Sequence, residues 1–177
     1  MVADVRSVDP KMVAVIQQDA AKIGITFTVR STSAAYPTIQ TPSKNVPFGE
    51  RPGWGKDYAD ALTFFAPLFD GRNIIPQGNT NYSLVGITPS QCKTLKITGN
   101  CANVPNVNSD LDHCATLAGQ PRTTCYENLD KKLTTQVVPW IPWLQGNSVH
   151  ITSSRVTHWE FDQNPNAPAY ENISISS

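Results

Sequence analysis

The sequence lacks any imbalance of charge. Its 177 residues include 14 Lys and Arg and 14 Asp and Glu, so the formal net charge is zero. A protein that binds nucleic acid through its phosphates needs a basic surface. The balance therefore argues against nucleic acid as the main partner.

Long apolar runs are also missing. The longest, residues 137–144, is far shorter than the ~20 residues of a membrane-spanning helix. The first residues show neither the basic segment nor the apolar run of a signal peptide. We therefore expect no transmembrane helix, and the length is enough for one domain with its own core.

Cysteines are few, but all four fall in one polar segment, at Cys92, Cys101, Cys114 and Cys125. No pair has the Cys-x-x-Cys spacing of a zinc ribbon or thioredoxin motif, and His113 beside Cys114 has the wrong spacing for a compact metal site. An even count in a loop-rich stretch suggests two disulfides and an oxidising compartment. We favour Cys92–Cys101 and Cys114–Cys125, because each closes a short loop and would stabilise the fold by roughly 2–3 kcal/mol. Unpaired thiols in a cytosolic protein are the alternative.

Catalytic motifs are lacking too. The sequence contains no Gly-x-Ser-x-Gly, no His-Glu-x-x-His and no phosphate-binding glycine loop. Asp57 and Asp60 are paired carboxylates, but their spacing suits helix capping as well as chemistry. We expect a protein that is not an enzyme and that has no catalytic residue, metal or cofactor.

What is present predicts an α/β arrangement. Asp9 as N-cap and Pro10 at the first helical position open a helix with apolar residues at helical spacing, and Gly24 ends it. Residues 25–29 then alternate between apolar and polar, as in a half-buried strand. A helix followed by a strand is typical of a layer in which the helix packs on a sheet.

The remaining segments are predicted from their composition. Residues 59–69 favour a helix that Pro67 bends or shortens, and residues 71–108 form a long polar loop that needs the disulfides for order. Residues 111–138 are mostly helical, with Pro121 opening a second helix. Extended or strand structure is expected at the following places: near Phe48, and over 138–144, 149–152, 157–161 and 173–175.

Four segments occur in the order seen in one protein family. They are Ala20-Ala-Lys-Ile-Gly-Ile before a strand and a Tyr, Gly53-Trp-Gly-Lys-Asp-Tyr, the stretch from Asn79 to Tyr82, and Arg122-x-x-x-Tyr126 followed by Val138-Pro-Trp-Ile-Pro. On these segments the sequence resembles the solute-binding proteins of ABC importers that take up peptides, dipeptides and nickel complexes. Ala61 departs from the family, which often has Pro at that place.

The resemblance implies a fold and a location. Residues 1–145 would form most of the second α/β lobe of a two-lobed, periplasmic-binding-protein-like fold, with a cysteine-stapled insertion at about 88–125. Residues 146–177 would return toward the first lobe. The chain is then expected to be a fragment of an exported lipoprotein of the periplasm or the outer membrane face, anchored through a missing N-terminal part. Its expected role is to capture peptides or similar solutes and to deliver them to an ABC permease.

The resemblance also implies ligand-binding residues. Such proteins close two lobes around the ligand, and burying a zwitterionic peptide requires partners for both charged ends. Asp57 matches the acidic residue that pairs with the peptide amine, and Arg51 a basic position that meets the carboxylate. Gly53 and Gly55 would let the backbone approach an extended peptide, and Trp54 would supply an apolar wall.

Each assignment has an alternative. Asp57 suits a helix cap, Trp54 an ordinary core residue and Arg51 a solvated loop charge, and we expect Arg122 and Tyr126 to be structural. A secreted, disulfide-stapled hydrolase, or a carbohydrate-binding or interaction domain, is the alternative function. The family's fold alone does not decide between them.

Overall fold

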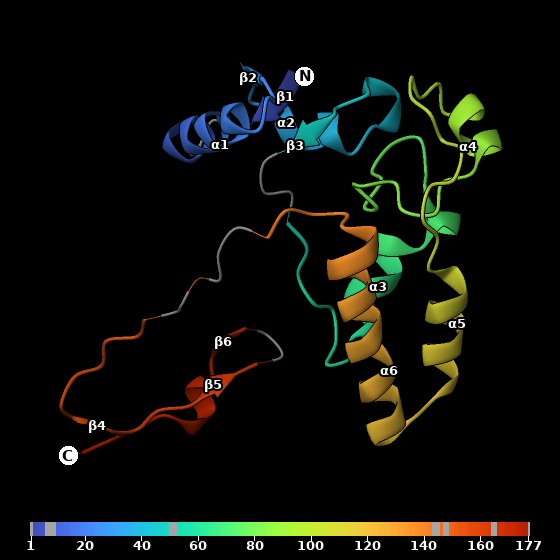
Figure 1. Ribbon diagram of the computed structural model, residues 1–177. Helices are drawn as coiled ribbons and strands as arrows, with labels where there is room; N and C mark the ends of the chain where they lie inside the picture. The colour runs from blue at the N-terminus through green and yellow to red at the C-terminus, as the bar shows by residue number, and fades with distance from the viewer. Residues whose placement is uncertain are drawn as a thin grey trace.

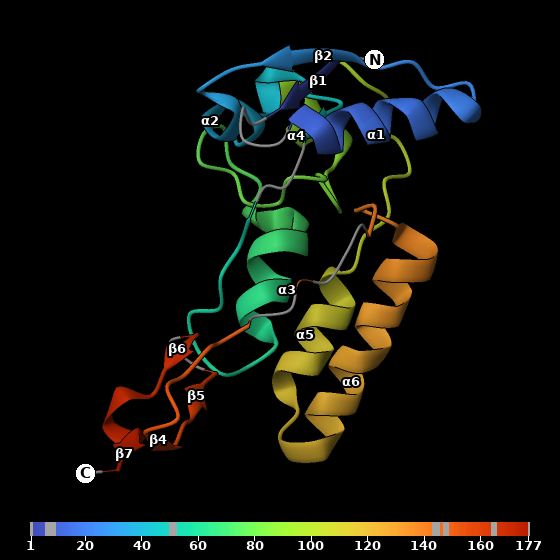
Figure 2. The same cartoon turned by 90° about the vertical axis from the view of Figure 1, so that its left-hand side faces the viewer.

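Three regions follow one another in the computed structural model, which describes residues 2–5, 10–49, 53–142, 146, 149–163 and 166–176. We name them the parallel layer (2–49), the helical region (53–142) and the C-terminal arm (149–176). Figure 1 shows the arm extending away from the helices, and Figure 2 shows the parallel layer lying over one end of them. The architecture is mixed α/β, as predicted.

The parallel layer is a strand, a crossover helix and a second strand, joined by a third strand. Its elements are β1 (Val2–Val5), α1 (Pro10–Lys22), β2 (Thr28–Ser31), α2 (Ala35–Ile39), the 3₁₀ turn η1 (Pro42–Lys44) and β3 (Phe48–Gly49). The strand order is β2-β1-β3, and β1 is parallel to both neighbours. Parallel strands need such a crossover, which α1 supplies.

The predicted helix and strand of this layer are both present, but the strand begins later than predicted. The helix starts at Pro10, and Asp9 lies outside the described residues. The amide of Ile25 still donates to the helical carbonyl of Ala20 (2.9 Å), and Gly24 has a φ of 79°. These residues therefore finish the helix in the left-handed conformation that glycine tolerates, and they are not free to pair with β1.

The parallel layer has a thin core. Val13 of α1 is buried against Val29 and Phe48. The sequence did not predict α2, because its surroundings are rich in Pro, Ser and Thr. Burial of Ala35 and Ile39 stabilises that short helix instead. Helix formation here depends on tertiary contact more than on local propensity.

The helical region contains three main helices and several short ones among its described residues. They are α3 (Leu62–Phe69), the 3₁₀ turn η2 (Gly71–Asn73), α4 (Pro89–Thr94), α5 (Asn108–Thr116), α6 (Gly119–Lys132) and its π-helical continuation η3 (Leu133–Val137). The stretch 111–138 is mostly helical and contains two helices, as predicted, and a π-helix ends it. Pro121 lies in the first turn of α6, where its missing amide hydrogen costs little.

The main core lies where α3, α5 and α6 meet. Its buried residues are Leu68, Phe69, Val85, Val107, Leu111, Cys114, Tyr126, Leu129 and Leu133. The structure joins Cys114 to Cys125 between α5 and α6, and Cys92 to Cys101 near α4. These are the two pairs favoured from the sequence.

The loop between α3 and α5 is long and mostly irregular, as predicted. It has a smaller core of its own, formed by Ile74, Ile87, Cys92 and Leu95. The helix α4 was not predicted, although Thr88 and Gln91 form a capping box at its start. Elsewhere the loop crosses itself so tightly that a Cβ at Gly71 would overlap the carbonyl of Gly86. Only glycine fits that position.

The C-terminal arm consists of two small antiparallel pairs. Its elements are β4 (Val156–His158), β5 (Phe161–Asp162), β6 (Ala167–Pro168), the 3₁₀ turn η4 (Tyr170–Asn172) and β7 (Ser174–Ile175), with β4 paired to β7 and β5 to β6. The predicted strands at 157–161 and 173–175 are present in part. The predicted strand over 149–152 is wrong, because that stretch pairs with no strand among the described residues. Residues 138–142 are not helical, as predicted, but they form no edge strand with another described segment, and 143–144 lie outside the described residues.

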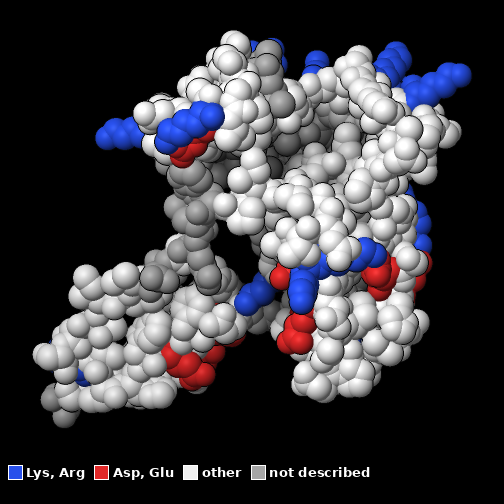
Figure 3. Space-filling model, in the orientation of Figure 1, with Lys and Arg blue, Asp and Glu red and all other residues white. Residues whose placement is uncertain are grey.

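The surface carries charges of both signs. Figure 3 shows Lys and Arg beside Asp and Glu on the helical region, so neither sign dominates this face. Over the part of the chain that the structure describes, no helix is both long and apolar enough to span a membrane.

Candidate functional site

Four of the five predicted ligand-binding residues lie on one turn, residues 53–60, which leads into α3. Gly53, Trp54, Gly55 and Asp57 are described there, and Arg51 lies outside the described residues. We name residues 53–60 the Asp57 turn. Three separate sets of contacts fasten it to the rest of the molecule.

The first set fixes Trp54. Its indole Nε1 donates to the carbonyl of Thr63 (2.8 Å), inside the first turn of α3. That carbonyl is free because its usual helical donor would be the amide of Pro67, and proline has none. The half-buried ring also packs against the main core. Trp54 is therefore partly a core residue and partly a surface of the turn.

Thr63 also fixes Asp57, which completes the first set of contacts. The buried Thr63 hydroxyl accepts a hydrogen bond from the Asp57 amide (2.8 Å) and donates to its Oδ2 (3.2 Å). The Asp57 side chain is otherwise exposed. Asp57 does not cap the helix α3, because Ala61 is its N-cap residue, and the carboxylate that bonds the first helical amide, that of Leu62 (2.8 Å), belongs to Asp60. Thr63 therefore holds Asp57 in place, and the Asp57 carboxylate does not cap the helix.

The second set of contacts joins the turn to two tyrosines. The hydroxyls of Tyr36 and Tyr82 lie 2.6 Å apart, and they lie 3.2 and 3.3 Å from the carbonyl oxygen of Gly53. Tyr36 belongs to α2 and Tyr82 to the loop after α3. This triangle of oxygens ties the Asp57 turn to the parallel layer.

The third set is an ion pair with α6. Arg122 Nε and Nη2 donate to Asp60 Oδ2 and Oδ1 at 2.8 and 2.9 Å. The guanidinium holds the pKa of the Asp60 carboxyl below its ordinary value, because it stabilises the charged form. The Arg122 guanidinium carbon also lies 5.1 Å from the ring centroid of Tyr126. Burial raises the pKa of Tyr126, whose hydroxyl finds no partner among the described atoms.

The two glycines of the turn face open space. No described atom lies within 4 Å of the place where a Cβ would stand at Gly53 or Gly55. Neither residue has the positive φ that favours glycine. The described residues therefore give no steric or conformational reason for glycine at these two positions.

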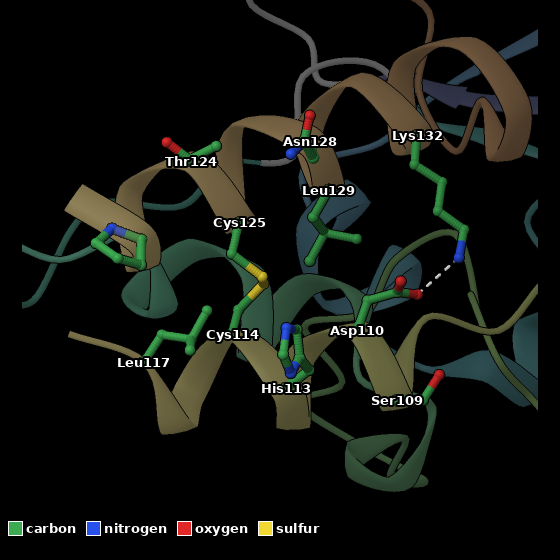
Figure 4. Close-up of a pocket in the computed structure, with 11 residues that line it drawn as sticks. Ser109, Asp110, His113, Cys114, Leu117, Thr124, Cys125, Asn128, Leu129 and Lys132 are labelled. Atoms are coloured by element: carbon green, nitrogen blue, oxygen red, sulfur yellow. Dashed lines mark hydrogen bonds and ion pairs between the residues drawn. A yellow bond between two sulfur atoms is a disulfide. The ribbon is translucent and has the colours of Figure 1, made fainter. Parts of the chain in front are cut away.

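Two further hollows lie on the helical region. A groove of ≈ 600 Å³ runs between α5 and α6, and Figure 4 shows the Cys114–Cys125 disulfide and the Lys132–Asp110 ion pair (2.7 Å) bridging these helices. A smaller, apolar pocket of ≈ 340 Å³ is lined by α3 and the proline-rich segment after α6, with Phe64 and Trp140 among its residues. Neither hollow includes a residue of the Asp57 turn.

The sequence predicted Trp54 and Asp57 as ligand residues but did not predict the residues that hold them. Tyr36 and Tyr82 lie within the resembling segments, yet nothing in their spacing indicated that they meet at Gly53. Arg122 and Tyr126 were expected to be structural, and the contacts with Asp60 agree with that role. Within the described ranges, no three His, Cys, Asp or Glu side chains gather closely enough to bind a metal ion.

Comparisons with protein-family models, with curated proteins and with solved structures find no match to this chain.

Proposed function

We propose that this chain contains most of the second α/β lobe of an extracytoplasmic solute-binding protein, with a C-terminal tail that returns toward the first lobe, and that this protein captures peptides or similar solutes and delivers them to an ABC permease. The observation that carries the proposal is the Asp57 turn. It presents an exposed carboxylate, an aromatic side chain and two open glycines within a few residues of each other.

The chemistry of the turn suits the amino end of a peptide. The Asp57 carboxylate is anchored on one oxygen by the buried Thr63 hydroxyl, so it pays little side-chain entropy when it meets an ammonium group. Trp54 is fixed beside it by its bond to the Thr63 carbonyl. Arg51 is proposed to meet the carboxylate end, and the open backbone at Gly53 and Gly55 to bond an extended chain.

Two other features of the structure support the proposed function. The crossover connection of β1, α1 and β2 is the unit from which α/β lobes are built. The two disulfides are compatible with an oxidising compartment outside the cytoplasm. The permease and the first lobe are the partners that this function requires.

Titration by NMR tests the proposal, because it detects the weak binding expected of half a pocket. Labelled chain is titrated with trialanine and with N-acetyl-trialanine, which lacks the free amine. We expect the amide signals of Gly53, Gly55 and Asp57 to shift with trialanine, with a Kd of about 1 mM or weaker. The acetylated peptide should shift them at least ~10-fold less, since its amine carries no charge.

Two variants separate specific from general binding. Asp57→Asn should abolish the preference for the free amine, while Asp130→Asn, which removes another exposed carboxylate on α6, should preserve it. Equal shifts with both peptides, or shifts confined to residues outside the Asp57 turn, would show that the amine site is absent. Turnover of a peptide or a glycan would instead favour the hydrolase.

A further inference from the structure

Arg122 makes more contacts than an ion pair needs. Besides its fork onto Asp60, its Nη1 donates to three carbonyl oxygens at the end of α5, those of Cys114, Ala115 and Leu117, at 2.9, 3.0 and 3.3 Å. The last carbonyls of a helix have no partners within the helix and carry partial negative charge. One guanidinium therefore binds the end of α5 and the Asp57 turn together.

On the side of α5, the helix end that Arg122 binds is cross-linked to α6. Cys114, whose carbonyl Arg122 binds, is disulfide-bonded to Cys125 on α6, and its side chain is buried in the main core. Arg122 and Cys125 both belong to α6. The guanidinium is thus held by α6 at one end and by a cross-linked helix end beside it, so its position relative to the core is fixed.

On the side of the Asp57 turn, a short series of hydrogen bonds links Arg122 to Asp57, the predicted ligand residue. Asp60 Oδ1 accepts both from Arg122 Nη2 and from the Leu62 amide, which sets the start of α3. The next residue, Thr63, holds the Asp57 carboxylate. Moving Asp60 would therefore move the start of α3, and with it the Thr63 hydroxyl that holds the Asp57 carboxylate.

We propose that Arg122 is the positioning residue of the Asp57 turn, and that it fixes the Asp57 carboxylate for ligand by clamping Asp60 to the disulfide-bonded end of α5. This inference rests on the proposed function. A merely structural ion pair would stabilise the fold without affecting the geometry at Asp57. If Arg122 positions the turn, its loss weakens ligand binding more than an equally destabilising substitution elsewhere does.

The chain offers a matched control in Arg72. Its guanidinium also bridges two segments, since it bonds Asp70 and Asp112 at 2.8 and 2.7 Å. These partners lie in the loop after α3 and in α5, not in the Asp57 turn. Arg72→Gln and Arg122→Gln therefore each remove a guanidinium that bridges two segments, and of the two only Arg122 reaches the turn.

The experiment compares the two variants and the wild type in the full chain. With trialanine as probe, we expect Arg122→Gln to weaken binding ~10-fold or more, because misplacement of a positioned group is costly, and Arg72→Gln to weaken it less than ~2-fold. Arg122→Lys keeps the charge but not the fork, so its affinity should fall between the two. Asp60→Asn breaks the same ion pair and replaces Arg122→Gln if that variant does not fold.

A second readout needs no ligand. The Asp57 amide bonds to Thr63 and the Leu62 amide bonds to Asp60, so both bonds join the turn to the start of α3. The hydrogen exchange of these two amides should accelerate ~10-fold in Arg122→Gln, while amides of the main core keep their rates. Unchanged exchange at both amides would overturn the positioning role, and so would equal losses of affinity in the Arg122 and Arg72 variants. If wild type binds no trialanine, the proposed function fails, and the exchange rates still decide whether Arg122 positions the turn.

Discussion

The helical region and the C-terminal arm have similar kinds of apolar residue but use them differently. The helical region buries its Leu, Phe and Val side chains in a contiguous core, with a disulfide between its two longest helices. In the arm, Val149, Ile151 and Ile175 are 82%, 95% and 65% exposed. Apolar composition alone therefore does not make a core, because layers must close on each other before that surface leaves water.

The arm is nevertheless ordered within itself. The rings of Trp159 and Phe161 lie 4.8 and 5.5 Å from that of His150, and Arg155 bonds to Ser176 across the arm. Such contacts give a small cluster in which Ala169 is buried, but the larger apolar side chains Val149, Ile151 and Ile175 stay exposed. The comparison predicts that stability is concentrated in the helical region, and that changes in the arm leave it almost untouched.

The largest effect should come from the main core. Leu129 on α6 is 3% exposed, so Leu129→Ala removes buried methyl groups and leaves a cavity, at a cost of about 3 kcal/mol of unfolding free energy. Ile151→Ala makes a comparable truncation in the arm and should change it by less than about 0.5 kcal/mol. Urea unfolding followed by far-UV circular dichroism measures both. Similar losses would mean that the arm shares the core.

The disulfides should come next. Cys114–Cys125 and Cys92–Cys101 span 11 and 9 residues, so loop-closure entropy predicts about 2–3 kcal/mol for each. Paired Cys→Ser variants remove one bond at a time. We expect the Cys114–Cys125 variant to be the less stable, because it also places polar hydroxyls in the main core. The reverse order would indicate that the loop near α4 contributes more to cooperative folding than its small core suggests.

A smaller effect, which should be present at neutral pH and lost in acid, should come from Asp60. Arg122 holds its pKa below the ordinary value of 3.8, so the folded state favours the carboxylate. Its contribution to stability is complete above that ordinary value and is lost as the pH falls through the lowered pKa. The stability difference between wild type and Asp60→Asn should thus stay constant from about pH 7 to 5 and shrink below about pH 4. Asp19→Asn, which breaks an exposed pair with Lys22, serves as control and should change little.

Much of the fold could be predicted from local patterns. The helix starting at Pro10, the helices around Leu68 and Leu129, and the two disulfide pairs all follow from periodicity, prolines and short loops. The helix α2 could not, because its stability comes from burying Ala35 and Ile39. The strand order β2-β1-β3 was equally out of reach, since it depends on pairing between distant segments.

The candidate site likewise has a part that the sequence predicts and a part that it does not. Trp54 and Asp57 stand out as a compact motif, but their supports are distant in the sequence. Arg122 meets Asp60 across 62 residues, and Tyr36 meets Tyr82 across 46. A single sequence carries no signal for such pairs. The Thr63 carbonyl differs, because Pro67 four residues later is a local signal, unused in the sequence analysis, that this carbonyl needs another donor.

The smallest effect should follow from removing the C-terminal arm altogether. A chain that ends at residue 148 loses Ile151, Tyr170 and Ile175, which are 95%, 75% and 65% exposed, and so loses little buried surface. We expect the unfolding free energy of the helical region to change by less than about 0.5 kcal/mol, and binding of a hydrophobic dye to fall as exposed apolar groups disappear. Ile151→Ser and Ile175→Ser in the intact chain should lower dye binding in the same direction. A loss of several kcal/mol on truncation would mean that the arm folds back onto the helices in solution, and the contrast between the two regions would then be wrong.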